Sequence, residues 1–129
     1  MSDTIMELTA RILAFRDARD WAQFHSPKNL SMALAIEAAE IMDIFRWSTE
    51  IESRQIATNR PGAAANPAAL TQVTEEIADV AVFLLILCHE TGVDLREAVL
   101  AKLRDNELRY PVEQARGRAE KWTAYKGYP

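Results

Sequence analysis

The chain has 129 residues and carries 15 Lys and Arg against 19 Asp and Glu, a formal net charge of −4. This length predicts one domain with its own core, and the acidic balance argues against a broad basic surface for nucleic acid. The single cysteine, Cys88, excludes a disulfide within the chain, and the apolar run 80–88 is far shorter than the ~20 residues that span a bilayer. Because residues 1–4 lack a basic segment, we expect no signal peptide and a cytoplasmic protein without a membrane or nucleic-acid partner.

Apolar residues at helical spacing predict four helices, at about residues 4–24, 27–47, 71–91 and 95–110. Residues typical of helix ends flank these segments: Thr4 with Glu7, Ser26 with Pro27, Gly92, and Asp94 with Glu97. The connection 48–70, which contains Pro61 with Gly62, is expected at the surface with a short helical turn. We expect an all-α domain over residues 1–111, followed by a C-terminal arm over 112–129 that packs on a neighbour.

The segments 27–47 and 71–91 are apolar on nearly all sides. Helices of this kind lie at the centre of a bundle or in a subunit interface. A chain this small has too few other helices to cover both of them. We therefore expect a four-helix bundle-like protomer that assembles into a dimer or tetramer.

Two acidic motifs stand inside these apolar segments. Glu37, Glu40 and Asp43 follow one another at intervals of three residues, and Glu76 and Asp79 are spaced in the same way. Positions three apart differ by about 60° around a helix, so each motif forms a stripe on one face. An unpaired buried carboxylate is costly, and the nearby basic residues are too few to neutralise these stripes.

Divalent cations are the partners that such carboxylates suggest. Mg²⁺ prefers oxygen ligands and shares them with substrate phosphates, and it can activate water, so the motifs suit hydrolysis of a phosphoanhydride. A di-iron bundle needs Glu-x-x-His pairs, and neither His25 nor His89 lies three residues after an acid. Solvated or ion-paired carboxylates are the structural alternative.

Further residues are candidates for binding a nucleotide. Lys102, Asn106 and Arg109 recur on one face of the segment 95–110, with Tyr110 next. Lys and Arg suit phosphate, although a solvated basic face is an equal alternative.

Aromatic residues lie near the acidic motifs as well. Trp21 and His25 end the first segment, Trp47 ends the second, and Phe83 lies one turn after Asp79. Aromatic rings can stack on a base, although they are also common in cores. They are therefore candidates for either role.

Three segments of the chain resemble one family when they are read in order. The first runs from Arg19 to Leu30 and contains Trp21 and His25. The second combines Glu37-x-x-Glu40 and Phe45-x-Trp47 with Glu76-x-x-Asp79-Val80. The third is Lys102-x-x-x-Asn106-x-x-Arg109-Tyr110-Pro111. Over about residues 19–111 the chain resembles the all-α nucleoside triphosphate pyrophosphohydrolases of the MazG type, and most closely the small dCTP pyrophosphatases.

The resemblance implies hydrolysis of a nucleoside triphosphate to the monophosphate and pyrophosphate. It implies dCTP or a modified dCTP as the first candidate substrate. It implies Mg²⁺, with Mn²⁺ as a substitute, at four catalytic acids: Glu37, Glu40, Glu76 and Asp79. It also implies a base pocket near Trp21, His25 and Trp47, contacts to phosphate or sugar from Lys102, Asn106 and Arg109, and a homotetramer of paired dimers. Phe83 and Tyr110 complete the set of predicted substrate-binding residues. The chain departs from the subgroup at Asp43 and Phe83, where the relatives carry Glu and Tyr.

Two alternatives stay open from the sequence. One is a dUTP or broad dNTP pyrophosphatase of the same architecture. The other is a helical module that binds a nucleotide without turning it over. Release of pyrophosphate distinguishes the enzyme from the binding module.

Overall fold

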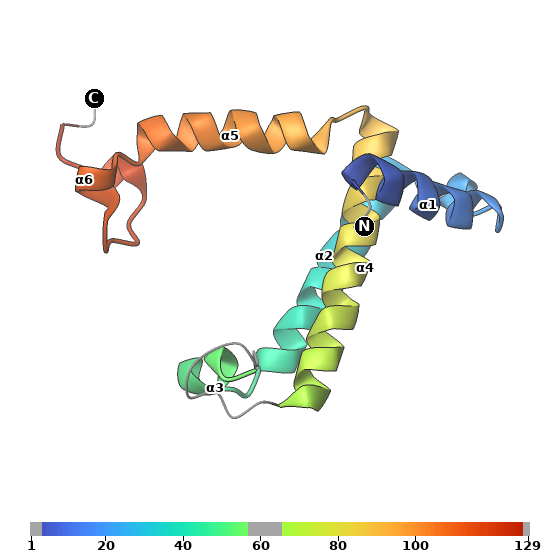
Figure 1. Cartoon of the computed structure of the whole chain (residues 1–129), viewed down its shortest axis with the longest axis horizontal. Helices are drawn as coiled ribbons and strands as arrows, with labels where there is room; N and C mark the ends of the chain where they lie inside the picture. Colours follow the sequence, from blue (N-terminus) through green and yellow to red (C-terminus); the bar gives the residue numbers. More distant parts are fainter. Residues whose placement is uncertain (1–3, 57–65, 128–129) are drawn as a thin grey trace. The chain divides into compact units, whose positions relative to one another are not determined.

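The computed structural model describes residues 4–56 and 66–127, and these residues contain helices but no strand (Figure 1). The chain divides into two compact units, Met1–Gly92 and Val93–Pro129. The first unit contains α1 (Ile5–Asp17), η1 (Ala22–Phe24), α2 (Pro27–Phe45), α3 (Glu50–Arg54) and α4 (Pro67–Thr91). The second contains α5 (Leu95–Arg109), α6 (Val112–Ala115) and η2 (Trp122–Ala124).

The predicted all-α class is confirmed by these elements. The predicted domain boundary at residue 111 stays a prediction. The short helical turn expected within the connection 48–70 is confirmed as α3, whereas Pro61 and Gly62 lie outside the described residues, as do residues 1–3. No described helix has the length and apolar character needed to cross a membrane.

Local capping determines where several helices begin. The Thr4 hydroxyl accepts a hydrogen bond from the Glu7 N–H, and the Glu7 carboxylate accepts one from the Thr4 N–H at 2.7 Å. Ser26 caps α2, which starts at Pro27, and Asp94 caps α5. Each cap satisfies a backbone donor that the helix leaves unpaired and stabilises its helix by about 1 kcal/mol. The predicted capping residues are therefore confirmed.

Two helix boundaries differ from the prediction. The first helix ends at Asp17 rather than near residue 24, because Asp20 has a φ of 53° in the left-handed region, which interrupts a right-handed helix. Helix α4 begins at Pro67 rather than near residue 71, because Asn66 accepts a hydrogen bond from the Ala69 N–H at 3.1 Å. Proline in the first turn costs the helix no hydrogen bond.

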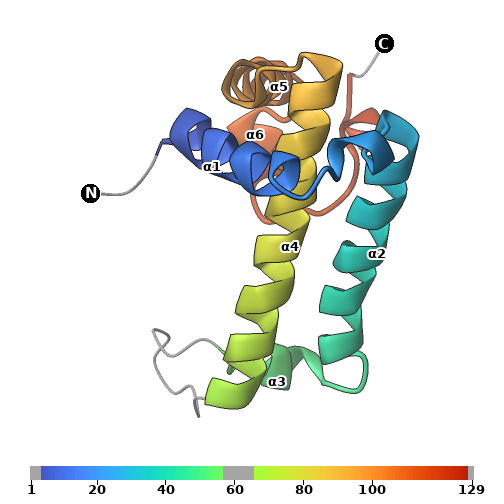
Figure 2. The ribbon, with the colours of Figure 1, turned by 90° about the vertical axis from the view of Figure 1, so that its right-hand side faces the viewer.

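The core of the first unit lies between α2 and α4, which run antiparallel side by side, with α1 packed against α4 (Figure 2). Leu30 of α2 and Leu85 and Ile86 of α4 are buried. Ile36 and Ile77, from the same two helices, are each more than half exposed. The pair of helices thus buries only part of its apolar surface within the first unit.

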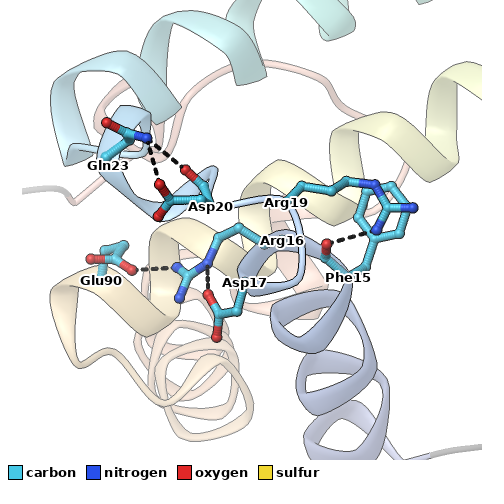
Figure 3. A network of polar contacts seen from close by, with 7 residues as sticks. All are labelled: Phe15, Arg16, Asp17, Arg19, Asp20, Gln23 and Glu90. Atoms are coloured by element: carbon cyan, nitrogen blue, oxygen red, sulfur yellow. Dashed lines mark hydrogen bonds and ion pairs between the residues drawn. The ribbon is translucent and has the colours of Figure 1, made fainter.

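A buried ion pair fixes the end of α1 to α4. The Arg16 guanidinium contacts the Glu90 carboxylate at 2.6 Å and the Asp17 carboxylate at 2.8 Å, and the Arg16 side chain is only 8% exposed (Figure 3). The Gln23 amide donates to the Asp20 carboxylate and carbonyl, both at 3.0 Å. Two partners satisfy the charge of Arg16, so its burial is tolerated. Together these contacts hold the turn between α1 and α2.

The second unit is formed by α5 and the segment that follows it. The ring of Tyr125 lies edge-on to that of Tyr110, with 5.9 Å between the ring centroids, and Tyr125 is buried. The Arg118 guanidinium lies 5.1 Å from the Tyr125 ring centroid. The predicted C-terminal arm therefore packs on the end of α5 in its own chain.

Candidate functional site

Three of the predicted catalytic carboxylates meet between α2 and α4. Glu37 of α2 and Glu76 and Asp79 of α4 each offer a carboxylate oxygen, and these oxygens lie within 4.8 Å of one another. Glu37 and Glu76 are half-buried, while Asp79 is exposed. We call these residues the acidic triad. Its donor set consists of carboxylate oxygens alone, which suits a hard divalent cation such as Mg²⁺.

The triad carries mutual repulsion that a cation would relieve. Partial burial raises the pKa of the Glu76 carboxyl above its ordinary value, and the charges of Glu37, Glu40 and Asp79 raise this pKa further. A hydrogen bond with Glu37 also favours the protonated form of Glu76. Bound positive charge would favour the ionised form instead.

The other two acids of the predicted α2 stripe have different surroundings. Glu40 is exposed and lies outside the triad, although its charge acts on Glu76. Asp43 forms an ion pair with Arg46 at 3.6 Å. The assignment of Glu40 as a metal ligand stays a prediction, and Asp43 has a local partner that needs no metal.

His25 and Phe83 come together near the triad. Their rings meet edge-on, with 6.3 Å between centroids and an interplanar angle of 79°. Phe83 follows Asp79 by four residues on α4, so both lie on the same face, about 6 Å apart along the axis. The Nδ1 atom of His25 is buried and has no hydrogen-bond partner among the described residues.

The two tryptophans predicted to line the base pocket, Trp21 and Trp47, have different environments. Trp47 is 85% exposed just beyond the end of α2, and the Arg46 guanidinium lies 5.0 Å from its ring centroid. Trp21 is 44% exposed and packs edge-on against Phe15, with 5.8 Å between centroids. Neither ring is part of the buried core. Trp47 has little packing in the chain itself, whereas Trp21 is held by α1.

The Phe15 ring also carries a cation. The Arg19 guanidinium lies 3.7 Å from the Phe15 ring centroid and donates to the Phe15 carbonyl at 2.9 Å (Figure 3). Its distance to the Trp21 ring centroid is 6.0 Å. The side chains of Phe15, Arg19 and Trp21 thus pack against one another at the turn after α1.

The predicted phosphate-binding residues share a partner that the sequence pattern alone did not reveal. Asp105 on α5 lies 3.8 Å from the Lys102 ammonium and 3.3 Å from the Arg109 guanidinium. The face is therefore of mixed charge rather than uniformly basic. Asn106 and Tyr110 are half-buried, and the Tyr110 ring packs on Tyr125. Asp105 lies three residues after Lys102 and four before Arg109. This helical spacing is the sequence signal from which both ion pairs could have been predicted.

Comparison with known proteins places the chain among pyrophosphatases. The model of the MazG-like family matches residues 32–124. The chain is 38% identical to bovine dCTP pyrophosphatase 1 over 124 residues, covering 95% of this chain and 69% of that protein. It is 39% identical to the rat protein of the same name over 110 residues, covering 84% of this chain and 60% of that one.

A solved structure agrees with these relatives. A crystal structure of a pyrophosphatase from Archaeoglobus fulgidus matches with a TM-score of 0.72 and 36% identity, over 86% of this chain and 95% of that chain. The predicted all-α fold and the predicted enzyme class, a nucleoside triphosphate pyrophosphohydrolase, are confirmed. The chain belongs to the MazG-like family.

Proposed function

We propose that this chain hydrolyses a deoxynucleoside triphosphate to the monophosphate and pyrophosphate, with dCTP or a modified dCTP as its first substrate and Mg²⁺ as its cation. The acidic triad, whose oxygens lie within 4.8 Å of one another, is the observation that carries this proposal. The names of the bovine and rat relatives support the choice of dCTP. Removal of aberrant nucleotides from the cytoplasmic pool is the matching role.

In this proposal Glu37, Glu76 and Asp79 hold the cation, with Glu40 as a fourth ligand and Mn²⁺ as a substitute ion. A bound divalent cation polarises the α-phosphoryl group and lowers the pKa of the attacking water. The carboxylates would hold the cation in place, and the reaction needs no covalent intermediate with the protein. The motivating feature is the meeting of three carboxylates from two helices.

The remaining site residues divide between the base and the phosphates. His25 is the polar contact to the base, while Trp21, Trp47 and Phe83 supply apolar walls. Lys102, Asn106 and Arg109 contact phosphate or sugar, as the family resemblance implies, and Tyr110 is a further substrate-binding residue. Selectivity among bases then depends on residues of the first unit.

We also propose that a second copy of this chain covers the exposed apolar faces of α2 and α4, with two such dimers forming a tetramer. Met42 is 72% exposed and Ile36 is 58% exposed, although both belong to a helix that is apolar on nearly all sides. Exposed apolar surface of this kind marks an interaction site. Light scattering measures the mass directly, and a monomer at micromolar concentration would contradict this assembly.

Pyrophosphate release from a panel of dNTPs with Mg²⁺ tests the proposal. We expect dCTP or a modified dCTP to be fastest, and Glu37→Gln to lose most of the activity while remaining folded. Glu75→Gln is the matched control, because Glu75 is an exposed acid on α4 outside the triad. Fastest turnover of dUTP would replace the substrate, and nucleotide binding without pyrophosphate release would identify a non-catalytic binding module.

A further inference from the structure

The segment after α5 returns to the last turn of that helix and places an aromatic ring on a predicted phosphate-binding residue. The Arg109 guanidinium lies 5.1 Å from the Trp122 ring centroid, and Trp122 begins the short helix η2. The edge-on pair of Tyr110 and the buried Tyr125 fixes this segment to the end of α5 next to that contact. The contact thus belongs to a packed unit.

Arg109 is held on two sides yet remains open to a ligand. Asp105, one turn earlier, lies 3.3 Å from its guanidinium, while the central carbon of that guanidinium lies over the Trp122 ring. The Arg109 side chain is still 41% exposed. It borders a cavity of about 240 Å³ that is also lined by Gln114, Trp122 and Lys126. Stacking on a ring uses the face of a guanidinium and leaves its edge donors for an anion.

We propose that Trp122 is a positioning residue that orders Arg109 for the triphosphate of the substrate. A free arginine side chain loses rotamer freedom when it binds an anion, and a side chain that is already ordered loses less. Trp122 therefore acts on substrate binding through Arg109, although it lies in the segment after α5. The inference rests on the proposed role of Arg109 in binding phosphate, and it assigns to Trp122 the role of orienting Arg109.

The test compares Trp122→Leu, which keeps apolar volume but removes the aromatic face, with Trp122→Phe, which keeps a face. We expect Trp122→Leu to raise KM for dCTP by about three- to tenfold with kcat nearly unchanged, because one cation–π contact and the order it gives are lost. Trp122→Phe should stay close to wild type. In an Arg109→Lys background, Trp122→Leu should have a much smaller effect, since the planar group that it orders is gone.

Two further measurements separate this inference from the proposed function. In NMR spectra, the Nε–Hε signal of Arg109, assigned by its loss in Arg109→Lys, should carry a ring-current shift that disappears in Trp122→Leu and is kept in part in Trp122→Phe. Calorimetric titration with inorganic tripolyphosphate and Mg²⁺ should show weaker binding in Trp122→Leu. Arg118→Gln is the matched control, because it removes a guanidinium from the Tyr125 ring in the same unit and should change neither measurement.

An active wild type whose KM and tripolyphosphate affinity are unchanged in Trp122→Leu would overturn the positioning role and leave the proposed function intact. Equal losses in Trp122→Phe and Trp122→Leu would also overturn it, because the aromatic face would then be irrelevant. If the wild type released no pyrophosphate from any dNTP, the proposed function would fail. The Arg109 signal and the tripolyphosphate titration would then decide the positioning role by themselves.

Discussion

Replacing Trp47 with alanine separates recognition of the base from stability of the chain. The Trp47 side chain is 85% exposed, so its removal takes almost no packing from the chain. Exposed substitutions of this kind change the free energy of unfolding by about 0.5 kcal/mol or less. We therefore expect the melting temperature of Trp47→Ala to match that of the wild type.

The effect on substrate binding should be much larger. Arg46 lies 5.0 Å from the centre of the Trp47 ring and occupies one of its faces, so a base can stack on the other face only. Stacking on one base is worth roughly 1–3 kcal/mol. Because each 1.4 kcal/mol is a factor of ten, KM for dCTP should rise by about 5- to 150-fold.

Steady-state pyrophosphate release, measured for each of the four dNTPs, checks this expectation. Trp47→Phe should retain much of the affinity because it keeps an aromatic face, and Ile51→Ala is a control at another exposed apolar side chain, 71% exposed. Size-exclusion chromatography shows whether the assembly has changed. An unchanged KM and an unchanged order of preference among bases in Trp47→Ala would refute the reasoning and place base recognition elsewhere.

Three other predictions follow from the site and from the buried ion pair. In metal-free protein, Glu76→Gln should raise the melting temperature at pH 7, because the folded-state pKa of Glu76 is raised and its ionised form therefore destabilises the fold. This stabilising effect of Glu76→Gln should fade as the pH is lowered below the ordinary carboxyl pKa. Added Mg²⁺ should raise the melting temperature of the wild type more than that of the variant. Equal melting temperatures of the two proteins, with and without Mg²⁺, would argue against the triad as a metal site. Hydrolysis in ¹⁸O-water should label the monophosphate and leave pyrophosphate unlabelled, whereas label in orthophosphate with a diphosphate product would indicate attack at the γ-phosphorus. Arg16→Leu should lower the free energy of unfolding by about 2 kcal/mol, measured in a urea titration. This loss is smaller than the roughly 3–5 kcal/mol expected for a fully buried ion pair, because the side chain of Glu90 is 30% exposed. An unchanged free energy of unfolding would mean that this ion pair does not stabilise the fold.

The sequence by itself determined the features that depend on neighbouring residues. Caps such as Thr4 with Glu7 and Asp94 with the Glu97 N–H form within three residues, so they follow from local backbone geometry. The left-handed Gly92, with a φ of 69°, ends α4 for the same reason. The helical period placed the acids on common faces before any packing was known. Family, fold class and enzyme class followed from these motifs and their order.

The tertiary structure decided which of these faces meet. Glu37 joins Glu76 and Asp79 because α2 and α4 pack side by side, whereas Glu40, on the same sequence stripe, lies outside the triad. Helix periodicity fixes the direction of a side chain around its own axis, but it contains no information on the partner helix or its register.

The same limit applies to other contacts between distant residues. Arg16 and Glu90 are 74 residues apart, and nothing within either helix indicates the other. Trp122 reaches Arg109 only because the segment after α5 reverses and packs through Tyr125. Such contacts are selected by burial of apolar surface across the whole fold, which is a property of three-dimensional packing and not of local sequence.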